Sequence, residues 1–154
     1  MSKKRDLELF IVDIFIAIYR IENYTHSFRS AQELWQDSLH WDAVIRELEI
    51  IGEAIKNLLQ DEHFFQLSPQ YFRQIVNFRN IVAHAYFGID EEEVWSVIQH
   101  KLHPLHNDLK LLSQTHFDLD EAFGTIIDYD LKNRDLALKN YLKKLHKEYK
   151  NHAR

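Results

Sequence analysis

Residues 41–58, WDAVIRELEIIGEAIKNL, decide the fold of this chain. Their apolar side chains recur with spacings of four, three, four and three: Val44, Leu48, Ile51, Ile55 and Leu58. That period is typical of an α-helix that buries one face, and it predicts a central core helix. Residues 5–23 share the period and predict a first helix, with apolar positions at Leu7, Phe10, Ile11, Ile14, Phe15, Ile18 and Ile21.

Local signals place the segments around the central helix. Ser30 and Glu33 fit a capping box, in which Ser30 accepts from a first-turn amide and Glu33 reaches back to the Ser30 N–H. The helix that begins there is expected to run, with a kink near residues 38–40, into the central helix. Residues 60–67 are expected to form a polar loop.

Two later helices are also indicated by their caps. Asp90 and the glutamates after it predict a helix that reaches about Leu112, with a bend at Pro104. Asp130 is expected to cap a last, lysine-rich helix. The apolar stripe of that helix consists of Leu138, Tyr141, Leu142, Leu145 and Tyr149.

These signals together predict the fold class. The sequence shows no strand alternation and no internal repeat, and only 3 Gly and 2 Pro interrupt its 154 residues. We therefore expect an all-α fold, an up-and-down bundle of four to five helices with an additional basic C-terminal helix. Residues 1–117 are expected to form the bundle domain and residues 118–154 the helical extension.

Composition excludes several classes of protein. With no cysteine, the chain can form no disulfide framework, cysteine zinc finger or thiol nucleophile. The net charge of -5 combines a body of −11 over residues 1–130 with a tail of +6 over residues 131–154. Glu8 and Asp13 interrupt the N-terminal apolar stretch, and no run reaches the ~18–20 apolar residues of a membrane span. A soluble, cytoplasmic protein without membrane contact is expected.

The most informative helix is expected to begin at Ser68-Pro69, an N-cap followed by a first-turn proline, and to end before Gly88. Its expected core face consists of Tyr71, Phe72, Ile75, Val76, Phe78 and Val82. Its polar residues follow one another at four, three and four and so line one stripe: Arg73, Asn77, Asn80 and His84.

Arg79 lies about 140° around the helix from His84, so only a long, bending arginine can share a site with that imidazole. An arginine and a histidine on one surface suit chemistry at phosphate. The guanidinium grips a phosphoryl group with two hydrogen bonds, and the imidazole moves a proton. The alternative without catalysis is that Arg79 and His84 only form salt bridges and cap a bundle helix.

Two segments extend this argument beyond spacing. Residues 79–86, RNIVAHAY, followed by FGID, resemble the Arg-x4-His-x-Tyr signature of HepT-like toxins, a DUF86-type branch of the HEPN ribonuclease superfamily. Residues 43–54, AVIRELEIIGEA, are similar to the core helix of that family. The resemblance spans roughly residues 7–112.

The resemblance implies a helical homodimer whose facing motifs form a composite RNA-cleaving cleft. Carried over by position, Arg79 stabilises the phosphate, His84 is the acid/base and Asn80 assists orientation. Cleavage is expected to need no metal and to leave a 2′,3′-cyclic phosphate. Glu53 either supports this cleft by orienting Arg79 or His84, or belongs to a solvent-facing ion-pair network within its own helix. Gly52 is expected to mark close packing of a neighbouring helix.

The resemblance also implies regulation. Tyr86 corresponds to the tyrosine onto which a cognate MntA-like minimal nucleotidyltransferase antitoxin transfers AMP, as in type VII-like toxin–antitoxin systems. ATP and magnesium belong to that partner, so no cofactor is expected for this chain. Ala85 departs from the family, which often has an acidic residue there. The alternative function is a non-catalytic HEPN module that binds a nucleotidyltransferase or a nucleotide.

Two further features have less specific interpretations. The spacing of His100, His103 and His106 suggests a metal site, but Pro104 intervenes and the strip supplies no convergent tetrahedral set, so none is expected. The lysine-rich C-terminal helix can bind RNA phosphates or dock on the acidic body. We favour an amphipathic helix that packs through its leucines and contacts a partner.

Overall fold

The computed structural model describes residues 6–84 and 88–152, without the side chains at 81, 83, 84, 151 and 152. Across these residues the regular elements are all helical, which confirms the predicted all-α class. The side chains of the predicted central stripe are all buried, with exposed fractions between 0% and 5%. Those of the first helix are buried from Ile11 onward, so both helices were placed correctly.

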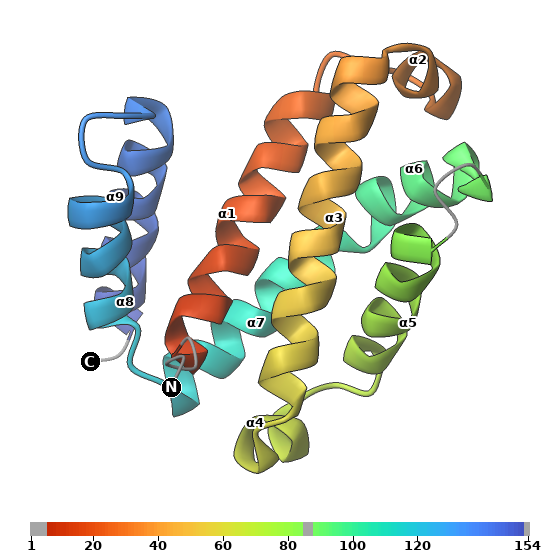
Figure 1. Ribbon diagram of the computed structural model, residues 1–154. Coiled ribbons are helices and arrows are strands. Elements are labelled where there is room, and N and C mark those ends of the chain that lie inside the picture. Colours follow the sequence, from red (N-terminus) through yellow and green to blue (C-terminus); the bar gives the residue numbers. More distant parts are fainter. Residues whose placement is uncertain (1–5, 85–87, 153–154) are drawn as a thin grey trace, which may run out of the picture.

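The core of the fold is a row of three long helices (Figure 1). Helix α1 (Leu7–Thr25) lies beside α3 (Ser38–Leu59), and the chain runs in opposite directions along the two. Helix α5 (Tyr71–His84) packs along the other side of α3. Helices α6 (Glu91–His100) and α7 (Leu102–His116) cross this row diagonally, and α7 packs on α1.

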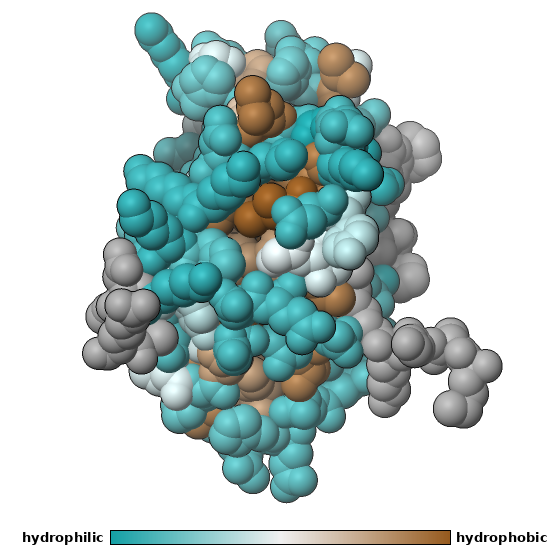
Figure 2. Space-filling view, turned by 90° about the vertical axis from the view of Figure 1, so that its left-hand side faces the viewer, coloured by the Kyte–Doolittle hydropathy of each residue, from teal (hydrophilic) through white to brown (hydrophobic). Residues whose placement is uncertain are grey.

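Shorter elements and the C-terminal segment surround this core. Helix α2 (Ala31–Gln36) packs on α3 and α6, and α4 (Glu62–Leu67) packs on α3. Helix α8 (Asp120–Thr125), the π-helical turn η2 (Ile126–Asp130) and α9 (Leu136–His152) lie beside α1, away from α5 (Figure 1). The surface on that side of the molecule is largely hydrophilic (Figure 2).

Helix α9 is amphipathic, as predicted. Four residues of its expected stripe are buried and belong to the same apolar cluster as α1 and α3: Leu138, Leu142, Leu145 and Tyr149. The Tyr149 hydroxyl accepts the Leu119 N–H at 3.1 Å and donates to the Phe117 carbonyl. These bonds attach the end of α9 to the turn between α7 and α8.

The region before α3 differs from its prediction in two details. The Ser30 hydroxyl accepts the Glu33 N–H at 3.2 Å, as expected, but the Glu33 carboxylate accepts from the N–H of Arg29 at 2.7 Å rather than from Ser30. The expected kink is a full break at Asp37, whose carboxylate accepts the His40 N–H and so starts a new helix.

The predicted loop at residues 60–67 is wrong, because most of that segment is helix α4. Asp61 caps its first turn. The Ser68 hydroxyl donates to the Phe65 carbonyl at 2.8 Å and closes α4, so Ser68 does not cap the next helix, which begins at Tyr71. A short polar helix with one buried side chain has too little apolar periodicity to be recognised.

Two further boundaries were also predicted wrongly. The helix that opens at Asp90 ends at His100, four residues before the expected bend. Pro104 lies in the first turn of α7, where a missing N–H is tolerated. The last helix is capped by Asp135 rather than Asp130, because residue 130 belongs to the π-helical turn.

A charge pair between a partly exposed arginine and a buried glutamate joins α1 to α3. Glu47 is 4% exposed, and its Oε1 lies 3.8 Å from Nη1 of Arg20. Its Oε2 is buried and has no hydrogen-bond partner among the described residues. Burial raises the pKa of the Glu47 carboxyl above its ordinary value of 4.5, and the nearby Arg20 and Arg46 oppose this shift only in part.

Replacing Glu47 by glutamine is expected to flatten the pH dependence of stability. Because the pKa of Glu47 is higher in the folded chain, the folded state holds the extra proton, and this residue costs stability as pH rises through the window above 4.5. Urea unfolding from about pH 4 to about pH 8 should show wild type losing free energy of unfolding relative to Glu47→Gln. A constant difference across that range would contradict this account of Glu47.

Candidate active site

The contact between α3 and α5 depends on a glycine. A Cβ at Gly52 of α3 would lie 2.1 Å from the Cβ of Arg79 and 2.4 Å from its Cγ, which no real pair of carbons allows. The missing side chain therefore lets the stem of Arg79 lie directly on the backbone of α3. This close approach confirms the interpretation of Gly52 made from the sequence.

The Arg79 guanidinium is held from both sides. Its Nη2 lies 2.9 Å from Oε2 of Glu53 on α3, and its Nη1 donates to Oδ1 of Asn80 at 3.1 Å. A guanidinium has five N–H donors, more than these two contacts use. The Arg79 side chain is 25% exposed, so a charged donor group is held at the surface in a defined orientation.

Of the two interpretations of Glu53, the structure supports the first, because Glu53 on α3 contacts Arg79 on α5. Glu53 follows Gly52 directly, so the residue that admits Arg79 and the residue that pairs with it are neighbours. The Glu53 side chain is 48% exposed, so water screens the pair and its contribution to stability is small. Its main effect is to fix the direction of the guanidinium.

The other predicted site residues are described less completely. His84 is the last residue of α5, so its backbone lies about 7.5 Å along the helix axis from Arg79, and its side chain lies outside the description. Tyr86 lies outside the described residues. Asn80 is exposed and contacts Arg79, and Arg73 and Asn77 of the predicted polar stripe are also exposed.

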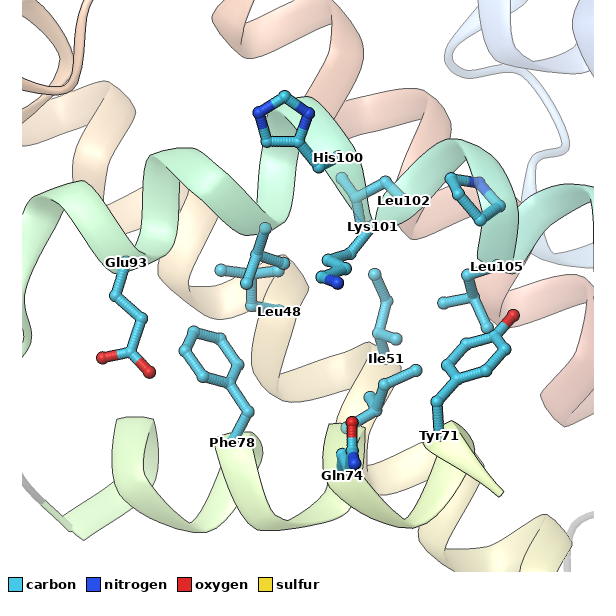
Figure 3. A pocket seen from close by; sticks show the side chains of 13 residues that line it. Leu48, Ile51, Tyr71, Gln74, Phe78, Glu93, His100, Lys101, Leu102 and Leu105 are labelled. Atoms are coloured by element: carbon cyan, nitrogen blue, oxygen red, sulfur yellow. The ribbon is translucent and has the colours of Figure 1, made fainter. Parts of the chain in front are cut away.

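A pocket of about 460 Å³ flanks α5, between it and helices α6 and α7 (Figure 3). Phe78 and Tyr71 of α5 line it, with Lys101 opposite, whereas Arg79 and Glu53 do not. Sequence reasoning missed this pocket because it assigned Tyr71, Ile75 and Phe78 to the core, and all three are only half-buried.

His103 and His106 of α7 contact polar side chains. His106 Nε2 lies 3.2 Å from the Tyr141 hydroxyl, and burial lowers the pKa of His106. His103 Nε2 lies 3.2 Å from the side-chain nitrogen of Asn107. In the part of the chain that the structure describes, no three His, Cys, Asp or Glu residues are placed to hold a metal ion, and no helix is long and apolar enough to cross a membrane.

Substitution of Gly52 by alanine is expected to destabilise the protein by about 1–2 kcal/mol. Overpacking costs about 1–3 kcal/mol, and the better helix propensity of alanine returns up to ~1 kcal/mol. Gly124→Ala in α8 is the matched control, because a Cβ there meets nothing within 4 Å, and it should stabilise by about 0.5–1 kcal/mol. Equal urea midpoints for the two variants would contradict the close contact.

An all-α bundle with an arginine at the α3 contact and a histidine five residues later on the same helix is the arrangement that the HEPN resemblance implies. The family model described as Ribonuclease HepT-like matches residues 14–112. The chain therefore belongs to the HepT-like ribonuclease family.

Curated relatives agree with this assignment. A Thermococcus cleftensis protein named "Probable ribonuclease HepT" is 34% identical over 110 residues, covering 71% of this chain and 97% of the relative. "Putative RNase MJ0127" of Methanocaldococcus jannaschii is 33% identical over 118 residues, covering 76% and 93%. The same organism's "Gamma-glutamylcyclotransferase and putative RNase MJ0434" is 28% identical over 146 residues, covering 92% of this chain and 64% of the relative. No solved structure matches the chain.

Proposed function

We propose that this chain is a HepT-like endoribonuclease toxin of a type VII-like toxin–antitoxin system that acts in the cytoplasm. The observation that carries the proposal is the fixed guanidinium of Arg79, held by Glu53 and Asn80 on the helix that ends at His84. The family assignment supports RNA as the substrate. Residues 1–117 form the catalytic domain in this proposal, and residues 118–154 are an extension that contacts a partner.

Arg79 acts on the phosphate in the proposed reaction. The N–H groups beyond those used by Glu53 and Asn80 can donate to two oxygens of the scissile phosphodiester, and the positive charge stabilises the additional negative charge of the transition state. Because Gly52 and Glu53 hold the side chain before substrate arrives, little orientation entropy remains to be lost.

His84 moves the proton in the proposed reaction. The imidazole removes the proton of the ribose 2′-OH while the 2′-oxygen attacks phosphorus and the bond to the 5′-oxygen breaks. The leaving 5′-oxygen takes up a proton as its bond to phosphorus breaks. The products are a 2′,3′-cyclic phosphate and a 5′-hydroxyl. RNA itself supplies the nucleophile, so the proposed reaction requires neither a nucleophilic side chain nor a metal ion.

A homodimer completes the proposed site. Arg79 lies at the surface of the chain and does not line the pocket between α5, α6 and α7. A second copy that brings its own α5 against this surface would form a cleft with two arginines and two histidines, which excludes water and strengthens each charged contact.

Silencing by a cognate MntA-like nucleotidyltransferase is the regulatory part of the proposal. Tyr86 lies two residues beyond His84 in the sequence, so AMP attached to its hydroxyl would place a phosphate and a bulky nucleoside next to the motif. The phosphate would compete with RNA for the guanidinium, and the nucleoside would block the cleft.

Substitution of Arg79 tests the proposed activity. Arg79→Ala should lower the rate of RNA cleavage by the purified protein about 100- to 1,000-fold, because it removes the transition-state donor. Arg134→Ala removes an exposed arginine that precedes α9, away from α5, and should cleave like wild type. Equal cleavage rates for all three proteins would contradict the role of Arg79, and cleavage by none of them would favour the non-catalytic HEPN module.

A further inference from the structure

A second pocket, which is lined by charged residues, lies between α1, α3 and the C-terminal segment. It has a volume of about 390 Å³, within the size range of small-molecule sites. Its wall includes apolar side chains from α1, α3, η2 and α9. Five charged residues also line it: Asp13, Arg20, Glu47, Asp130 and Arg134. None of the residues assigned to RNA cleavage lines this pocket, so it is a separate site.

Glu47 is the buried charged residue of the pocket wall. Its carboxylate is 4% exposed, and Oε2 has no hydrogen-bond partner among the described residues. The contact between Oε1 and Arg20 is 3.8 Å long, which is beyond hydrogen-bond distance. A buried carboxylate oxygen without a donor is costly, so native proteins rarely leave one unless another molecule supplies the N–H.

Arg20 does not supply that donor because it lies between two carboxylates. Its Nη1 is 3.8 Å from Glu47, and its Nη2 is 4.0 Å from Asp135, the cap of α9. Both distances are long, so the guanidinium is shared between the central bundle and the C-terminal segment. It can also attract an anionic group that enters the pocket.

We propose that this pocket binds a small ω-amino acid, a zwitterion whose ammonium and carboxylate groups are separated by a short carbon chain. The ammonium group of the ligand pairs with the carboxylate of Glu47, and the carboxylate of the ligand is held by Arg20 and Arg134. The short aliphatic part contacts the apolar wall.

The charges on the pocket wall favour a zwitterion over other ligands. A simple cation would meet the two guanidinium groups, and a simple anion would meet the carboxylates of Asp13, Glu47 and Asp130. Divalent metal ions prefer several convergent oxygens, and among the described residues no such set is found. A ligand with both charges satisfies Glu47 and the arginines together.

The test uses three probes with the same carbon chain: 4-aminobutanoate, butylammonium and butanoate. Calorimetric titration of the full chain should show binding of 4-aminobutanoate. Its affinity should fall about tenfold or more in Glu47→Gln, because a charge-assisted hydrogen bond is lost. The other two probes should bind about tenfold or more weakly to wild type for the same reason.

Two controls separate binding from folding. Glu49→Gln makes the same change of charge on α3 at a position that does not line the pocket, and it should bind like wild type. Arg134→Gln changes an exposed wall residue and should weaken 4-aminobutanoate binding if Glu47→Gln fails to fold. Absence of 4-aminobutanoate binding to wild type would overturn the proposal. Unchanged affinity in both pocket variants would also overturn it.

Discussion

Replacement of His84 by alanine is expected to slow RNA cleavage about 100- to 10,000-fold, because no other group in the proposed mechanism removes the 2′-OH proton. The binding of RNA should change little, since the phosphate contacts belong to Arg79. The measurement is single-turnover cleavage of a labelled RNA by purified protein, with RNA binding followed in parallel. Growth arrest on expression without the partner should disappear with the same substitution.

The matched control for this experiment is His103→Ala. His103 is an exposed histidine on α7 whose ring contacts Asn107, so its loss changes the histidine count and leaves α5 untouched. This variant should cleave at the wild-type rate. If His84→Ala cleaves as fast as His103→Ala, His84 is not the acid/base and the proposed mechanism fails.

Substitution of Tyr86 by phenylalanine is expected to abolish modification by the antitoxin, because the single oxygen that accepts AMP is removed. After coexpression with the cognate nucleotidyltransferase, the intact mass of wild type should increase by whole multiples of AMP. The mass of Tyr86→Phe should not change. The variant should also arrest growth in the presence of the antitoxin, whereas the wild type is silenced.

Tyr129→Phe is the control for that measurement. Tyr129 is 78% exposed and lies in the π-helical turn, so it is an equally accessible tyrosine elsewhere on the chain. The Tyr129→Phe variant should be modified at Tyr86 to the same extent as the wild type. Mass gains that persist in Tyr86→Phe and vanish in Tyr129→Phe would place the modification site in the C-terminal segment.

The central helices of the fold were predictable because apolar residues repeat along them with the period of an α-helix. The stripe from Val44 to Leu58 and the stripe of α9 each repeat with helical spacing, and both are buried. Gly52 was predictable for a different reason, since a glycine inside a strong helix costs about 1 kcal/mol and needs a compensating contact. That contact is Arg79.

The remaining features depend on contacts that sequence spacing does not specify. Glu53 and Arg79 are 26 positions apart in the sequence, so their pairing depends on how α5 packs on α3, and the sequence left two interpretations open. Capping residues were also ambiguous, because Ser68 can close one helix or open the next, and its hydrogen bond to Phe65 decides the matter.

Glu47 illustrates a signal that the sequence contained and the initial interpretation missed. It lies three residues after Val44 and four before Ile51, in the same phase as the apolar stripe of the central helix. A carboxylate at such a position must be buried, paired or used by a ligand. The structure shows that it is buried and that one of its oxygens has no described hydrogen-bond partner.

The central claim is that Arg79 and His84 cleave RNA by transesterification, and the ends of the cleaved RNA test it most directly. Wild-type protein should be incubated with a defined RNA in excess EDTA, and the fragments analysed by mass spectrometry. The account predicts fragments with 2′,3′-cyclic phosphate ends, formed at least 100-fold more slowly by Arg79→Ala and His84→Ala. Intact RNA with the wild type, or the same fragments at the same rate with both variants, would contradict it.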